Sequence, residues 1–175
     1  MQVRRVVTGH SPQGKAVFAS DMRVDGITVS MAPGVEFHRL WGGDSAPTFP
    51  DDGSPREGPA YFPPLGGYRF GLFTLPPGVV VPPEGLDMQA ATAEAEARLP
   101  GMLAVLEPDG LTHRTDTVDF EYVVSGEVWL QLDDGAEMHL RAGDTVVQNG
   151  TRHAWHNKGS VPCTMVVVLI GARRA

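Results

Sequence analysis

Short runs of β-branched and aromatic residues alternate along the chain with turn-forming Gly, Pro and Asp, and this pattern predicts many short strands. Turn sequences such as Asp133-Asp134-Gly135 and Asn149-Gly150 separate several runs, because Gly accepts a positive φ and Asn or Asp tolerates it. Strands at this spacing, without alternating helices, are typical of an antiparallel sandwich or barrel. The predicted strands are residues 16–20, 27–31, 36–41, 68–75, 103–106, 120–124, 128–132, 137–140, 145–148 and 163–170.

Two segments depart from this rhythm. Residues 42–67 contain six prolines, and because Pro lacks the backbone donor that a sheet needs, we expect a long irregular loop. Loops of this length are often functional, so the segment is interpreted as a lid, as an arm of a dimer, or as inert surface. Residues 87–99 are rich in Ala and Glu and are followed by Pro100-Gly101, which predicts a helix. Its apolar face is thin, so we expect it on the outside of the fold.

Length and apolar content indicate one folded domain. The chain has 175 residues, of which 42% are hydrophobic, and a chain of this length can bury one sizeable core. We therefore predict a single domain over residues 1–175, in which residues 1–67 supply N-terminal strands and the Pro- and Gly-rich loop. Residues 68–175 then form a barrel, and the candidate site lies within residues 111–157.

Charge and the remaining composition narrow the classes of partner and compartment. The formal net charge is −7 and no cluster of Lys and Arg is present, so we expect no nucleic-acid partner. Cys163 is the only cysteine, which excludes an internal disulfide framework and Cys-rich zinc motifs. The longest apolar run, residues 165–170, is too short to cross a bilayer, and no apolar signal segment follows the N-terminal arginines. We expect a cytoplasmic protein without a membrane partner.

Side chains with ligand or acid–base chemistry gather in the candidate site. Residues two apart in a strand share a face, so His113 and Thr115 are expected to point to one side, as are Asp119 and Glu121. If the strands curl into a barrel, His113, Asp119 and His153 converge inside it. Two imidazoles and one carboxylate can bind a divalent transition metal and leave positions open for water, substrate or dioxygen.

The spacing in this region resembles the two sequence motifs of the cupin superfamily. In the first motif, His113 matches the first His and Asp119 matches the Glu, with six residues between Asp119 and Gly126. Thr115 stands where the second His of that motif belongs, and Asp119 is shorter than the Glu.

The second motif of the superfamily is also matched in part. Gln148 stands in place of its Pro, with one residue fewer between Gly143 and that position. The matching positions are Gly143, Gly150, His153 and Asn157.

The resemblance implies an all-β double-stranded β-helix, a cupin jelly-roll barrel, with an N-terminal extension and one peripheral helix. It also implies a divalent ion, Fe, Mn, Ni or Zn, held by His113, Asp119 and His153. The alternative is a metal-free pocket in which these groups hydrogen-bond one another or the ligand. Cupins often dimerise through edge strands, and the exposed edges of an open barrel favour a homodimer here.

Four further side chains are candidates for roles in the pocket. Glu121 is a candidate general acid or base, because two neighbouring carboxylates raise the pKa of one of them; a salt bridge or an outward position is the alternative. Thr115 is a candidate partner of a metal-bound water. Trp155 is interpreted as an aromatic wall for a planar or apolar ligand, or as core packing. Arg69 is a candidate inward-pointing contact with the substrate.

These residues favour a small-molecule metalloenzyme in which a divalent ion assists acid–base chemistry on a chelating metabolite. A lyase, dehydratase, decarboxylase or isomerase is the expected reaction class, with Glu121 moving the proton. The alternatives are a non-catalytic or metal-free cupin that binds a small molecule, and an Fe(II) dioxygenase. The fold alone does not decide among them, since one fold carries many activities.

Overall fold

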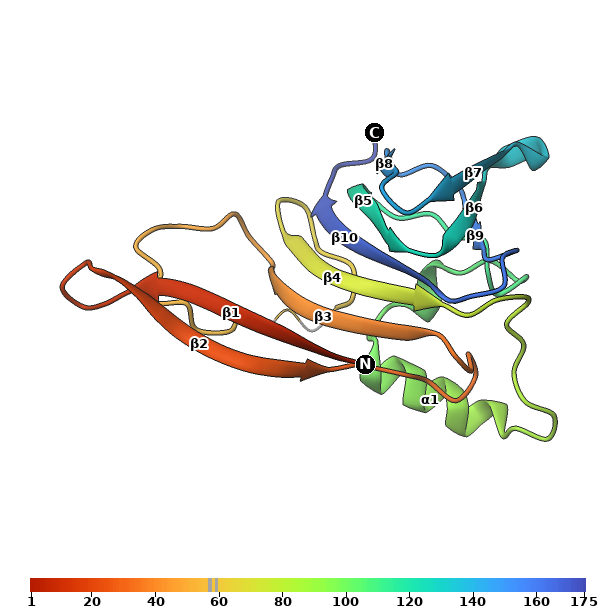
Figure 1. Cartoon of the computed structure of the whole chain (residues 1–175), viewed down its shortest axis with the longest axis horizontal. Helices are drawn as coiled ribbons and strands as arrows, with labels where there is room; N and C mark the ends of the chain where they lie inside the picture. The colour runs from red at the N-terminus through yellow and green to blue at the C-terminus, as the bar shows by residue number, and fades with distance from the viewer. Residues whose placement is uncertain (57, 59) are drawn as a thin grey trace.

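Ten strands form three antiparallel sheets in the computed structural model, which describes residues 1–56, 58 and 60–175. Figure 1 shows the two larger sheets curled around a common interior, with the strands from β5 onward in green to blue. This arrangement confirms the expected all-β fold, with two sheets around one core. The five-stranded sheet has the order β3 (Glu36–Gly43), β4 (Tyr68–Leu75), β10 (Cys163–Gly171), β5 (Thr117–Ser125), β8 (Thr145–Gln148). The three-stranded sheet has the order β7 (Glu137–Arg141), β6 (Glu127–Gln131), β9 (Ala154–His156).

One apolar core joins these two sheets. Phe73 on β4, Val123 on β5 and Met165 on β10 contribute from the five-stranded sheet. Val128 on β6 and Trp155 on β9 contribute from the three-stranded sheet. Strand β10 pairs with β4 along one edge and with β5 along the other, so it is central to the larger sheet.

The N-terminal segment is more regular than the sequence predicts. Strands β1 (Gln2–His10) and β2 (Ala16–Asp25) form a hairpin that extends away from the barrel in Figure 1, whereas only residues 16–20 were expected as a strand. Arg5 ties the hairpin to β3: its guanidinium donates to the carbonyl oxygen of Leu40 at 2.8 Å and lies over the ring of Trp41. Strand β3 itself pairs with β4, so residues before 68 supply one strand of the barrel sheet.

Two of the predicted strands, residues 27–31 and 103–106, are wrong. Side chains from both segments belong to the apolar cluster that covers the helix. Helix α1 (Met88–Arg98) begins where the sequence predicts, because the carboxylate of Asp87 accepts hydrogen bonds from the first-turn amides of Gln89 and Ala90. In segment 27–31 only Ile27 bridges to the sheet, at Phe37 of β3, and the apolar side chains of the segment pack with the helix. Residues Leu103–Val105 form a short 3-10 helix. None of the described helices is long and apolar enough to cross a membrane.

The Pro-rich segment 42–67 is irregular, as expected, and its described residues are anchored at several points. The carbonyl oxygen of Asp51 accepts a hydrogen bond from the amide of His10 in the hairpin at 2.7 Å. The amide of Tyr61 donates to the carbonyl oxygen of Pro100 at 2.8 Å, and the rings of Tyr61 and Phe62 pack against the barrel core. Residues 57 and 59 lie outside the described residues, and the roles of lid or dimer arm stay predictions.

Candidate functional site

Two histidines that are distant in the sequence meet at the edge of the barrel. His113 and His153 form an antiparallel bridge, in which each backbone amide donates to the other residue's carbonyl oxygen at 2.9 and 3.0 Å. Their imidazole centroids are 4.2 Å apart, and the rings are tilted by 53°. His153 is only 3% exposed, and His113 is half-buried. The sequence prediction that these two side chains converge therefore agrees with the geometry.

Each imidazole is oriented by a backbone carbonyl. Nδ1 of His113 lies 3.0 Å from the carbonyl oxygen of Leu111, and Nδ1 of His153 lies 2.9 Å from that of Thr151. Because a carbonyl oxygen only accepts, each Nδ1 carries the proton and each Nε2 keeps a lone pair. Burial lowers the pKa of His113, and burial together with the neighbouring His113 lowers the pKa of His153 to about 4. Both rings are therefore neutral at pH 7.

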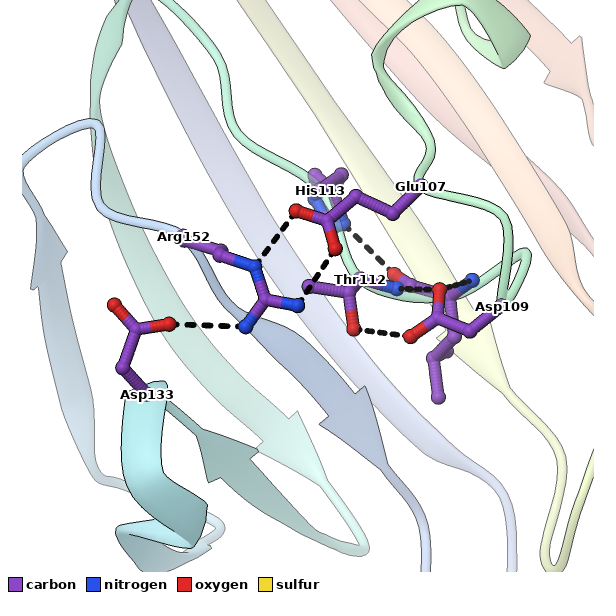
Figure 2. Close-up of polar contacts among 7 residues, drawn as sticks. Glu107, Asp109, Thr112, His113, Asp133 and Arg152 are labelled. Carbon is purple, nitrogen blue, oxygen red and sulfur yellow. Dashed lines mark hydrogen bonds and ion pairs between the residues drawn. The ribbon is translucent and has the colours of Figure 1, made fainter.

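An ion-pair network braces the two segments that carry these histidines, as Figure 2 shows. The guanidinium of Arg152 forms a bidentate pair with Glu107, both contacts at 2.6 Å, and a third contact with Asp133 at 2.9 Å. Asp109 closes the turn before His113 by accepting from the amide of Thr112 at 2.8 Å and from its hydroxyl at 2.5 Å. Because the network is exposed to solvent, its contribution to stability is modest, and its effect is to hold the two segments in register.

The ion-pair network is not predictable from local sequence patterns. Arg152 and Glu107 are 45 positions apart, and no local pattern pairs them. The turn at Asp109 does have a local signal, since an Asp followed by backbone amides two and three positions later is the pattern of an Asx turn.

Two carboxyl groups lie side by side on the interior face of β5. Asp119 and Glu121 alternate with outward-facing neighbours and are 4% and 7% exposed. Burial raises the pKa of Asp119 to about 6, against a smaller lowering by a hydrogen bond with Thr117. Burial, and then the charge of Asp119, raises the pKa of Glu121 to about 8. At pH 7, Asp119 is mostly ionised while Glu121 keeps its proton.

The same part of the barrel contains three buried polar atoms that have no hydrogen-bond partner among the residues described. They are Oδ1 of Asp119, Oε2 of Glu121 and Nε2 of Gln148. Gln148 is 3% exposed, lies on β8 and is the direct cross-strand partner of Asp119. In the sequence, Gln148 stands out only as a departure from the second motif. A polar residue at a position where that motif has Pro is a signal of a functional side chain.

The remaining candidates for substrate contact are engaged elsewhere. The hydroxyl of buried Thr115 pairs with that of Thr117 at 2.7 Å. Trp155 packs in the core against Phe73 at 6.3 Å between ring centroids, and its ring meets His153 edge-on at 6.0 Å. This position fits the core-packing interpretation and still leaves the indole beside one imidazole.

Arg69 is fully committed to structural contacts. Its five N–H groups make five hydrogen bonds of 2.6 to 3.1 Å. The acceptors are the carbonyl oxygens of Gly43, Ala60 and Tyr68, with Ala60 accepting twice, and the carboxylate of Asp44. A guanidinium has five donors, so a substrate contact from Arg69 requires one of these bonds to be lost.

The predicted metal ligands are placed in two groups rather than one. Across the described residues, no set of three or more His, Cys, Asp and Glu side chains is arranged to hold a metal ion. His113 and His153 meet at their bridge, which continues toward β9 of the smaller sheet, whereas Asp119 lies on β5 of the larger sheet. Asp is one methylene shorter than the Glu of the motif, so its carboxylate reaches less far from that strand. The residues in this arrangement do not fit a three-ligand centre.

Comparison with known proteins identifies the class of protein. Residues 102–169 match the family model described as Cupin domain. This part of the chain belongs to the cupin superfamily, as the two motifs predicted.

Among curated relatives, a phomopsin biosynthesis cluster protein C' of Diaporthe leptostromiformis is 44% identical over 50 residues, which cover 29% of this chain and 26% of that protein. The cupin-domain-containing oxidoreductase virC of Hypocrea virens is 38% identical over 64 residues, covering 35% of this chain and 33% of the relative. The chain thus spans about a quarter to a third of the length of the curated relatives it matches.

Solved structures with a similar course of the chain include an ethanolamine utilization protein Q from Salmonella typhimurium. It has a TM-score of 0.47 and 11% identity, with 99% of each chain covered. A predicted oxalate decarboxylase from Thermotoga maritima has a TM-score of 0.45 and 17% identity, with 84% of this chain and 92% of that chain covered.

The raised pKa of Glu121 predicts a pH-dependent stability. Between pH 7 and 8 the folded chain keeps much of this proton and the unfolded chain has lost it, so the free energy of unfolding falls as pH rises. His113 and His153 act in the opposite direction up to about pH 7.5, because unfolded histidines are still half-protonated at about pH 6.5, and they offset the Glu121 effect below about pH 7. The raised pKa of Asp119, about 6, also acts below this window. We expect a loss of about 0.5–1 kcal/mol per pH unit, measured by urea unfolding at pH 7, 7.5 and 8.

Glu121→Gln should remove most of this slope, because its amide does not titrate. Glu84→Gln, at an exposed position, should leave the slope unchanged. A slope between pH 7 and 8 that is the same in wild type and Glu121→Gln would show that Glu121 is not buried as described.

Proposed function

We propose that this chain is a small-molecule enzyme of the cupin type whose barrel catalyses proton transfer, of the lyase, dehydratase, decarboxylase or isomerase class. The observation that supports it most directly is the pair of buried carboxyl groups, Asp119 and Glu121, on one face of β5. Their environments separate the two pKa values to about 6 and about 8. One group is then a base and the other an acid at the same pH, which is the arrangement that acid–base enzymes need.

The proposed step is the enolisation of a carbonyl compound. The Asp119 carboxylate removes a proton from the carbon next to the carbonyl, and the electron pair of that C–H bond becomes a C=C bond. The carbonyl oxygen takes up the electron pair of its π bond and receives the proton of Glu121. The step is a transfer of two protons without oxidation or reduction, and its reversal returns a proton to carbon.

The experiment that tests this proposal follows hydrogen exchange. Phenacyl alcohol, a neutral hydroxyketone, is incubated with the protein in deuterium oxide containing EDTA, and its methylene signal is followed by NMR. The proposal expects the signal to disappear faster than in buffer alone. Exchange at the rate of the buffer control would overturn it.

A second candidate function is a metal-dependent oxidoreductase, which includes the Fe(II) dioxygenase hypothesis. Three relatives from Hypocrea virens, Aspergillus ruber and Neurospora crassa are named cupin-domain-containing oxidoreductases. The Nε2 atoms of His113 and His153 both keep their lone pairs, and a carbonyl on Nδ1 is how metal-binding imidazoles are usually oriented. The sequence predicts Asp119 as a third ligand for Fe, Mn, Ni or Zn, but in the described arrangement only the two imidazoles meet, so this candidate requires Asp119 to move or another ligand to take its place.

Metal content separates the two candidates. Because only two imidazoles meet in the described arrangement, we expect protein purified without an affinity tag to hold well below one divalent ion per chain after dialysis. Elemental analysis by mass spectrometry measures this. Near-stoichiometric metal that disappears in His153→Ala, together with oxygen uptake when phenacyl alcohol is added, would favour the oxidoreductase instead.

A further inference from the structure

Three unpartnered atoms face the same part of the barrel interior. Asp119 and Gln148 are opposite each other on the adjacent strands β5 and β8. Glu121 is the next inward residue on β5, and diagonal neighbours on paired strands are within reach of long side chains. Each of the three side chains is more than nine-tenths buried and has one polar atom without a partner in the part of the chain described. Buried polar groups are nearly always hydrogen-bonded, so three such atoms together indicate the polar end of a bound molecule.

The hydrogen-bonding capacity of these atoms defines what they can bind. The hydroxyl of Thr151 donates to Oε1 of Gln148 at 2.9 Å, which orients the amide so that its Nε2 remains available as a donor. Asp119 and Glu121, side by side on β5, add carboxyl oxygens that accept hydrogen bonds. The cluster therefore presents an amide donor opposite carboxyl acceptors.

The charge of the cluster selects against anions. No basic side chain contributes to the pKa of Asp119 or of Glu121, and all five donors of nearby strand residue Arg69 are occupied. A carboxylate or phosphate placed here would lie against two buried carboxyl groups in a desolvated site without a cation to offset its charge. A neutral molecule is favoured.

We infer that Gln148, Glu121 and Asp119 recognise a neutral hydroxycarbonyl compound. Its carbonyl oxygen accepts from Nε2 of Gln148, and its hydroxyl donates to Oδ1 of Asp119, with the carboxyl of Glu121 beside them. This inference rests on the proposed function and specifies its substrate class. Gln148 is then a specificity-determining residue, at the position where the second cupin motif has Pro.

Binding measurements with phenacyl alcohol test this inference. The dissociation constant is measured by ligand-observed NMR in the presence of EDTA for wild type and for Gln148→Met, which keeps the side-chain length and removes the amide. We expect binding to weaken about tenfold in Gln148→Met, the effect of one hydrogen bond. Gln13→Met, the same substitution at an exposed position, is the matched control and should stay within about threefold of wild type.

Two further probes test the chemical class of the ligand. Phenacyl methyl ether lacks the hydroxyl that donates to Asp119, and mandelate is an anionic hydroxy acid of similar size. Both should bind wild type at least about tenfold more weakly than phenacyl alcohol. Equal binding of phenacyl alcohol by wild type and Gln148→Met, equal or tighter binding of mandelate, or no binding of phenacyl alcohol would overturn the inference.

The thermal midpoint of the unliganded variant provides a reading that does not depend on any probe. Gln148→Met removes the unpartnered donor Nε2 and also the bond that Oε1 accepts from Thr151, whereas Thr151→Val removes only that bond, so Gln148→Met should unfold at the temperature of Thr151→Val or above. A midpoint clearly below that of Thr151→Val would show that Nε2 is hydrogen-bonded within the protein. Recognition and catalysis are also separable: binding without hydrogen exchange contradicts the proposed function alone, whereas exchange that is unaffected by Gln148→Met contradicts the recognition alone.

Discussion

Glu121→Gln is expected to slow hydrogen exchange of phenacyl alcohol by about 10²- to 10⁴-fold, the usual contribution of a positioned general acid. The amide has nearly the same shape as the protonated carboxyl that the barrel buries, but it cannot release a proton to the carbonyl oxygen. Binding of the probe should change by less than about tenfold, because the amide still donates a hydrogen bond. The measurement is the exchange rate at saturating probe, by NMR at pH 7.

The control for this experiment is Glu84→Gln, the same substitution at an exposed position. It should retain the wild-type exchange rate. A Glu121→Gln variant that exchanges as fast as wild type would remove Glu121 from the mechanism, even if Asp119 remains the base. The thermal midpoint of Glu121→Gln at pH 7 should equal or exceed that of wild type, which separates a loss of chemistry from a loss of folding.

Gly126→Ala is expected to destabilise the protein by about 3–5 kcal/mol, a large share of the stability of a domain of this size. Gly126 lies between β5 and β6 with a φ of 75°, which an L-residue adopts at a cost. A Cβ placed there would lie 2.5 Å from the carbonyl oxygen of Pro162 and 2.8 Å from the Cα of Cys163. Both are backbone atoms at the start of β10, so neither can move without disturbing the central strand.

Gly135→Ala is the matched control. Gly135 has nearly the same φ, 74°, but no other atom lies within 4 Å of its added Cβ. Its loss of stability should be about 1 kcal/mol, the backbone cost alone. Urea unfolding of both variants measures the difference, and similar losses would show that the contact of Gly126 with β10 is unimportant.

Most strands could be predicted from local patterns, because alternating apolar runs and turn residues specify them directly. The two wrong strands show the limit of this approach. Residues 27–31 have the composition of a strand, but their apolar side chains pack against helix α1, and no local pattern reveals that contact. Strand β1 was missed because its polar and apolar residues form an exposed hairpin rather than a face of the core.

The candidate site was predicted in part. The meeting of His113 with His153, and the shared face of Asp119 and Glu121, follow from motif spacing and from the alternation of side chains along a strand. Gln148 joins them only through the register between β5 and β8, which requires the sheet order to be known. The five bonds of Arg69 depend on an irregular loop whose course the sequence pattern does not define.

The central place of β10 also affects how the chain reaches its native state. Both neighbours of this strand, β4 and β5, are synthesised well before it, and each presents an unpaired edge until β10 emerges from the ribosome. Closure of the sheet thus depends on contacts between segments far apart in the chain, and such contacts form slowly. During that interval the nascent protein is open to mispairing, and chaperone binding to the exposed edges of β4 and β5 would protect it.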